Sequence, residues 1–138
     1  MLQTAMCLGL ARPCLINARA SLAGVASVFI TEVEAMAGKL ALINAAMTKT
    51  AHSVGGPIPP TRAELLAMRL TAADVATGAA ALEAKTAGGK GYISSSGMSR
   101  RYREAAFIRA IPLRVTASLG AGLMRAVIGE QTPSGSRC

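Results

Sequence analysis

Glycines and cations between residues 85 and 109 are the side chains of this sequence best suited to bind a ligand. Gly88, Gly89 and Gly91 are three of four consecutive residues, and Lys85 precedes them by one helical turn. Glycines let backbone N–H groups approach a phosphate closely, and a nearby cation offsets the phosphate charge. Glycine also ends helices. The segment therefore predicts either a phosphate-binding turn or a plain helix C-cap.

Positive charge is concentrated in the same part of the chain. The net charge is +8, and from Lys85 onward nine Lys or Arg residues stand against two acids, Glu104 and Glu130. Such a charge attracts phosphorylated ligands and nucleic acids alike. The sequence has no nucleic-acid-binding motif and lacks the interleaved aromatic residues on which single strands stack. We therefore expect no nucleic-acid partner. A basic bundle bound to nucleic acid or to an anionic membrane surface is a hypothesis weaker than the two given at the end of this subsection.

Residues that hold metals or act as nucleophiles are few. His52 is the only histidine, and Cys7, Cys14 and Cys138 contain no CxxC pair. A zinc site or a His-based triad needs more such residues, and an odd set of cysteines does not indicate a disulfide framework. We expect free thiols in a reducing compartment, which indicates a cytoplasmic location, and we assign no catalytic or metal-binding residue.

The elements that position these residues are predicted to be helices, because apolar residues recur every three to four positions. The first helical stretch covers residues 2–30, with a kink or break near Pro13. A second helix covers residues 31–52 and stops before a connector, residues 55–60, that is rich in Gly and Pro and cannot be helical throughout.

A third helix begins with a capping box, in which Thr61 and Glu64 satisfy the free N–H groups of the first turn. Its Ala-rich stripe, which also contains Glu83, would let a neighbouring helix approach closely. The glycines after residue 87 end it, and a basic helix follows over residues 99–108. We therefore predict an all-α fold, an antiparallel helix bundle of about four helices.

One domain is expected, a helical bundle over residues 1–108, followed by a divergent C-terminal segment, residues 109–138, that ends in a disordered tail. The longest uncharged apolar candidate, Ala20 to Thr31, falls short of the roughly 18 residues that a membrane-spanning helix requires. We expect no membrane span.

Two segments resemble the C-terminal domain of acyl-CoA dehydrogenases. Lys85-Thr86-Ala87-Gly88-Gly89-Lys90-Gly91-Tyr92 is similar to the Gln-x-x-Gly-Gly-x-Gly-Tyr turn that closes a long helix in that family. Arg100-Arg101-Tyr102-Arg103-Glu104-Ala105 is similar to the family's Arg-Tyr-Arg-Asp-Ala helix start. The two segments occur in the family's order and at about its separation. The resemblance covers roughly residues 1–108 and implies the family's C-terminal helical bundle.

The resemblance also implies a place for FAD. In the family the glycine turn lies against the adenosine diphosphate half of this cofactor, which is often bound mainly by a neighbouring subunit. Carried over to this chain, Lys85, Gly88, Gly89 and Gly91 would line the cofactor. Lys85 stands where the family usually has Gln, so it cannot accept a hydrogen bond from adenine, although it can still attract a phosphate.

The family's catalytic base has no counterpart here. In many members it is a Glu a few residues past the Arg-Asp-Ala helix, where this sequence has Pro112, and Glu104 matches the family's Asp instead. No part of the chain resembles the family's N-terminal helical or middle β-domain. The leading hypothesis is a C-terminal domain or fragment of an acyl-CoA dehydrogenase-like flavin-dependent oxidoreductase, inactive alone, that arose as a truncated product, a separately encoded subunit or a frameshifted gene.

The expected partners follow from this hypothesis. They are a second copy of the chain, associated through the Ala-rich helix faces, or a chain that supplies the missing N-terminal and middle domains, with acyl-CoA as the substrate of the complete enzyme. The alternative is a non-catalytic helical interaction or oligomerisation module that has lost flavin binding, which Lys85 and Pro112 favour.

Overall fold

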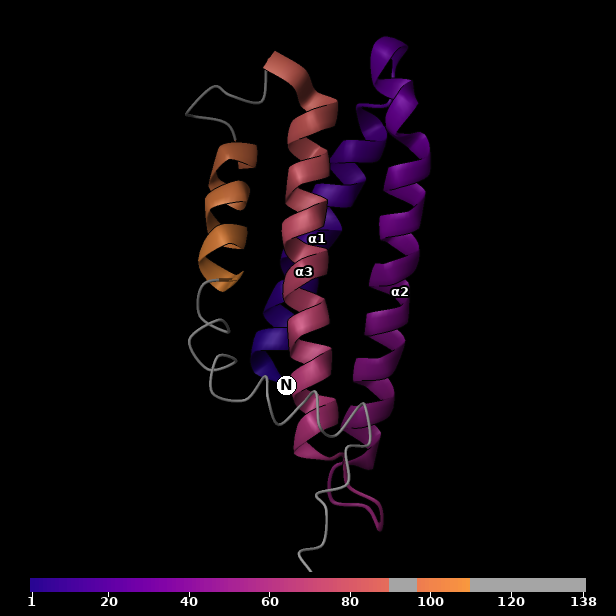
Figure 1. Ribbon diagram of the computed structural model, residues 1–138, viewed down its shortest axis with the longest axis vertical. Coiled ribbons are helices and arrows are strands. Elements are labelled where there is room, and N and C mark those ends of the chain that lie inside the picture. The colour runs from indigo at the N-terminus through magenta and orange to yellow at the C-terminus, as the bar shows by residue number, and fades with distance from the viewer. Residues whose placement is uncertain (90–96, 110–138) are drawn as a thin grey trace, which may run out of the picture.

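The computed structural model describes residues 1–89 and 97–109, and in these residues the chain forms helices and no strand. The elements are α1 (Leu2–Ala20), the short 3-10 helix η1 (Gly24–Phe29), α2 (Ile30–Ser53) and α3 (Arg62–Ala87). Residues 97–109 form a further helix, called helix 97–109 below. Successive long helices run antiparallel (Figure 1). The prediction of an all-α bundle is confirmed, whereas Gly91, Pro112 and the predicted disordered tail lie outside the described residues.

The prediction of a break near Pro13 is wrong, because α1 runs from Leu2 to Ala20 without interruption. Pro13 has no N–H and therefore leaves one helical carbonyl without its usual donor. The buried face of α1 extends on both sides of Pro13 and packs mainly against α3, which keeps the helix continuous. The helix ends instead at Ser21, and η1 then leads into α2.

The second predicted helix is confirmed, with α2 extending over Ile30–Ser53. Its inward face follows the helical period: Val33 and Ile43 are buried, and Met36, Leu40 and Met47 are partly buried against the core. The opposite face is exposed along the whole helix, including Leu42 at 70% exposure. Only one stripe of α2 therefore contributes to the core.

The third helix, α3, is the centre of the bundle. Its capping box is present, since the backbone N–H of Glu64 donates to Thr61 Oγ1 at 3.2 Å and the backbone N–H of Thr61 donates to Glu64 Oε2 at 2.7 Å. In Figure 1, α3 lies between α2 and helix 97–109, with α1 behind it. Small side chains let these neighbours approach closely, and those buried on α3 are Ala72, Ala73, Ala76, Ala79 and Ala80.

The Ala-rich face of α3 is therefore covered within the chain, mainly by α1 and also by α2. The buried alanines of α3 are therefore occupied within the chain, and the expected association of a second copy through Ala-rich helix faces stays a prediction. α3 is also the one described helix that is long and apolar enough, by length and composition, to cross a membrane. The buried core helix of a globular fold also meets these two criteria, so length and composition do not show whether α3 spans a membrane. The expected lack of a membrane span is therefore supported only in part.

Candidate functional site

The glycine turn at the end of α3 has the backbone that the sequence predicts. α3 ends at Ala87, and Gly88 takes φ +56° and ψ −145°, a conformation open to glycine and strained for other residues. A Cβ placed on Gly88 or Gly89 would meet no atom within 4 Å. The turn is exposed, so its backbone is accessible to a ligand. Gly91 lies outside the described residues.

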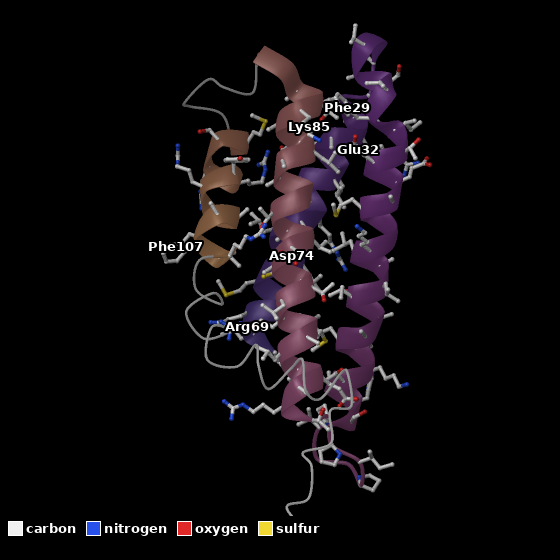
Figure 2. The ribbon with its side chains drawn as sticks, in the orientation of Figure 1. Phe29, Glu32, Arg69, Asp74, Lys85 and Phe107 are labelled. Atoms are coloured by element: carbon white, nitrogen blue, oxygen red, sulfur yellow. The ribbon has the colours of Figure 1, made fainter. Side chains whose placement is uncertain are left out.

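Lys85, the cation of the predicted cofactor site, points to the side of α3 that faces α2 and η1. Its Nζ lies 3.2 Å from Glu32 Oε2 on α2 and 5.7 Å from the centre of the Phe29 ring. Figure 2 shows these three residues together near the end of α3. Both side chains of the ion pair are about half exposed, so water screens it and a phosphate can compete with Glu32 for the Lys85 ammonium.

A groove of about 380 Å³ brings the two segments of the family resemblance together. It lies between α3 and helix 97–109 and is lined by Lys85 and Ala84 on one side and by Ser99, Tyr102 and Arg103 on the other. Arg103 and, once released from Glu32, Lys85 can hold a pyrophosphate, and the half-exposed Tyr102 ring can lie against an adenine. The described lining contains no carboxylate, so this groove offers no general base.

A second polar group of residues is buried where α1, α3 and helix 97–109 meet. Glu83 of α3 is 3% exposed, and its carboxylate forms an ion pair with Arg101 of helix 97–109 through Arg101 Nη2 and, at 3.0 Å, through Arg101 Nε. Asn17 of α1 donates its side-chain N–H to Glu83 Oε1 at 2.7 Å. Cys14 of α1 completes the group, which we call the Glu83 cluster.

The protonation states in the Glu83 cluster follow from these contacts. Burial by itself raises the pKa of the Glu83 carboxyl, but hydrogen bonds from Arg101, Asn17 and Cys14 outweigh it and hold this pKa below its usual value. Burial, followed by the neighbouring Glu83 carboxylate, raises the pKa of the Cys14 thiol to about 12. At neutral pH the cluster therefore contains a carboxylate, a guanidinium and a protonated thiol, and Cys14 is not a nucleophile.

Sequence reasoning missed the Glu83 cluster. Glu83 was assigned to the Ala-rich stripe of the third helix, and Arg100, Arg101 and Arg103 fit a solvated basic face equally well. One feature of the sequence indicates such a cluster: Glu83 has the same helical register as the alanines expected to be buried, and a buried carboxylate needs a charged partner. Several arginines follow the glycine turn, and no local pattern identifies Arg101 as the partner of Glu83. Arg100, the neighbour, pairs with Glu104 at 2.6 Å on the exposed side of the same helix.

The only histidine and the other cysteines take no part in either group. His52 is exposed near the end of α2. Cys7 is a buried free thiol on α1, as is Cys14 of the Glu83 cluster, and Cys138 lies outside the described residues. Within residues 1–89 and 97–109, no three His, Cys, Asp or Glu side chains gather in a way that could hold a metal ion.

Comparison with known proteins gives no further guide. No protein-family model, curated protein or solved structure matches this chain.

Proposed function

We propose that this chain is the C-terminal helical bundle of an acyl-CoA dehydrogenase-like, flavin-dependent oxidoreductase and contributes to the site of the FAD adenosine diphosphate. One observation carries the proposal. Lys85, three residues before the exposed positive-φ glycine that follows α3, lines one groove together with Tyr102 and Arg103 of helix 97–109. These residues belong to the two segments on which the family resemblance rests.

The residues present fit the phosphate-bearing half of the cofactor. Lys85 and Arg103 would hold the pyrophosphate, the backbone of Gly88 and Gly89 would approach it, and Tyr102 would lie against the adenine. The flavin ring, when bound, supplies the acceptor for a hydride from the substrate. The described residues supply no base beside this groove, so proton removal from acyl-CoA requires the N-terminal and middle domains, from another chain or from other parts of a longer one.

FAD titration tests this proposal directly. The protein, purified under reducing conditions, is titrated with FAD and followed by the visible absorbance and fluorescence of the flavin. We expect binding that weakens at least fivefold in Lys85→Ala and in Arg103→Ala. Lys49→Ala removes the same charge from an exposed position on α2 and should bind FAD as the parent does. Equal binding by all these proteins, or none by the parent chain, would refute the proposal.

A non-catalytic interaction module is the second candidate, and the exposed apolar residues favour it. Several large apolar side chains are more than two-thirds exposed on α1, η1 and α2: Leu2, Val25, Val28 and Leu42. Single exposed apolar residues are normal on protein surfaces, so the candidate depends on those that adjoin, such as Val25 and Val28 on the short helix η1. Sedimentation velocity at several concentrations tests this candidate, which requires self-association that Leu42→Lys weakens, together with an absence of FAD binding.

A further inference from the structure

A second groove, of about 830 Å³, lies on another side of helix 97–109 and has a different character. It runs between α1 and helix 97–109 and is lined on α1 by Met6, Gly9, Leu10 and Pro13. Its other wall extends from Gly97 to Ile108. At a rise of 1.5 Å per residue, the α1 wall is about 10 Å long and the opposite wall about 16 Å long. The groove is open to solvent and elongated along the two helices that line it.

The walls of this groove are mostly apolar and incompletely covered. Met6 is 53% exposed and Phe107 is 68% exposed, and Figure 2 shows Phe107 projecting from the outer side of helix 97–109. Gly9 leaves its centre open, because a Cβ there would meet no atom within 4 Å. A flexible alkyl chain lying along the groove would cover the apolar atoms that the fold leaves in water.

Cationic side chains at the edge of the groove favour a ligand whose alkyl chain ends in an anionic group. Arg100, Arg101 and Arg103 line it, and Glu104 is the only acid in the described lining. Arg101 is already paired with the buried Glu83. Glu104 is engaged by Arg100 Nε, whereas Arg103 uses one Nη to donate to Ser99 at 3.1 Å. A guanidinium has five N–H donors, so Arg103 retains donors for a carboxylate. A second copy of this basic helix would be repelled, and an anionic head group attracted.

We infer that the groove between α1 and helix 97–109 binds a long-chain fatty-acid anion, its alkyl chain along Met6, Gly9, Leu10 and Phe107 and its carboxylate at Arg103. Arg103 lines both grooves, but the inference does not rest on the flavin proposal, because Lys85, Tyr102 and the glycine turn are not part of this groove.

Isothermal titration with dodecanoate below its micelle concentration tests the inference. We expect saturable binding that is tighter for dodecanoate than for decanoate, by up to about tenfold for two further methylene groups. Gly9→Leu should weaken binding at least tenfold, because Gly9 lines the groove and a Cβ there meets no protein atom within 4 Å, so the new side chain takes up groove space. Gly38→Leu makes the same exchange on α2, where a Cβ also meets nothing, and should leave binding unchanged.

Two further variants test the assigned contacts. Arg103→Gln should weaken binding several-fold, whereas Arg109→Gln, which removes the same charge from a residue outside the groove that pairs with Asp74, should not. If Gly9→Leu loses its helical circular dichroism, Phe107→Ser provides the same test from the exposed edge of the groove.

Three results would overturn the inference. The first is dodecanoate binding that Gly9→Leu and Phe107→Ser leave intact. The second is binding to phosphatidylglycerol vesicles without binding to monomeric dodecanoate, which would identify a membrane surface as the partner. The third is dimerisation that Gly9→Leu abolishes in a chain that ignores dodecanoate. Loss of FAD binding in Lys85→Ala bears only on the flavin proposal, so the two proposals can fail separately.

Discussion

Replacing Glu83 by Gln perturbs the fold at the point where three helices meet. The carboxylate is 4% exposed, accepts from Asn17 of α1 and pairs with Arg101 of helix 97–109. In Glu83→Gln an amide N–H replaces one carboxylate oxygen and faces a donor, either Arg101 or Asn17. The guanidinium also loses its counter-charge. Helix 97–109 should therefore lose much of what fixes it against α1 and α3.

The size of the effect can be bounded from exposure. Breaking a fully buried ion pair by removing one charge costs about 3–5 kcal/mol, and a hydrogen bond to a charged group contributes about 1.5–3 kcal/mol. The Arg101 side chain is 24% exposed, so part of its charge can be hydrated once Glu83 is neutral. We expect Glu83→Gln to lower the free energy of unfolding by about 2 kcal/mol.

Urea unfolding followed by far-ultraviolet circular dichroism at pH 7 measures this loss. The matched control is Glu104→Gln, which removes the same charge from a pair in the same helix whose Arg100 partner is 77% exposed. That pair is screened by water, so little change is expected. A Glu83→Gln protein as stable as Glu104→Gln would refute the assignment of Glu83 as the residue that holds helix 97–109.

The pH dependence gives an independent check. The pKa of Glu83 is lower in the folded state than in the unfolded state, so its stabilisation is present above the unfolded value of about 4.3. It is lost as the pH falls through the lowered folded value. The difference in unfolding free energy between the parent and Glu83→Gln should therefore be constant near neutral pH and shrink below about pH 4. A difference that is the same at pH 7 and at low pH contradicts the argument.

Three further predictions concern the bundle itself. Ala76→Leu should lower the free energy of unfolding by about 1–3 kcal/mol in a urea titration, because Ala76 is fully buried on α3 and a larger side chain must displace its neighbours; an unchanged midpoint would show that the core is loosely packed. Gly38→Ala should stabilise the protein by up to about 1 kcal/mol, whereas Gly88→Ala should destabilise it by about 1–2 kcal/mol, because only Gly88 has a positive φ; thermal melts that give both the same sign would contradict this. In a Cys138→Ser background at pH 8, a disulfide reagent should modify Cys7 and Cys14 only as fast as the protein opens, since both are buried and burial raises the pKa of each thiol; modification at the rate of a free thiol would refute it.

Local structure in this chain follows from local signals in its sequence. The Thr61–Glu64 capping box formed where the residues predict it, and α2 took its buried stripe from the period of Val33, Leu40 and Ile43. The glycines after Ala87 ended α3, with Gly88 at positive φ. Each of these depends on interactions within a few residues, so the sequence by itself determined them.

The course of α1 was decided by tertiary packing instead. Pro13 favours a break, but the buried face of α1 continues across it against α3. The contacts of the face outweigh the missing hydrogen bond, and a single helix results. Packing also covered the Ala-rich face of α3 inside the chain, mainly by α1 and also by α2.

The two candidate sites also depend partly on local sequence and partly on tertiary packing. The sequence singled out Lys85 and the glycine turn, but only the fold placed Lys85 beside Glu32 and in one groove with Tyr102 and Arg103. The pairing of Glu83 with Arg101, and not with Arg100 or Arg103, depends on which side of helix 97–109 meets α3. Residues far apart in sequence become partners through helix docking, and helix docking is set by the shape of the whole core rather than by any local pattern.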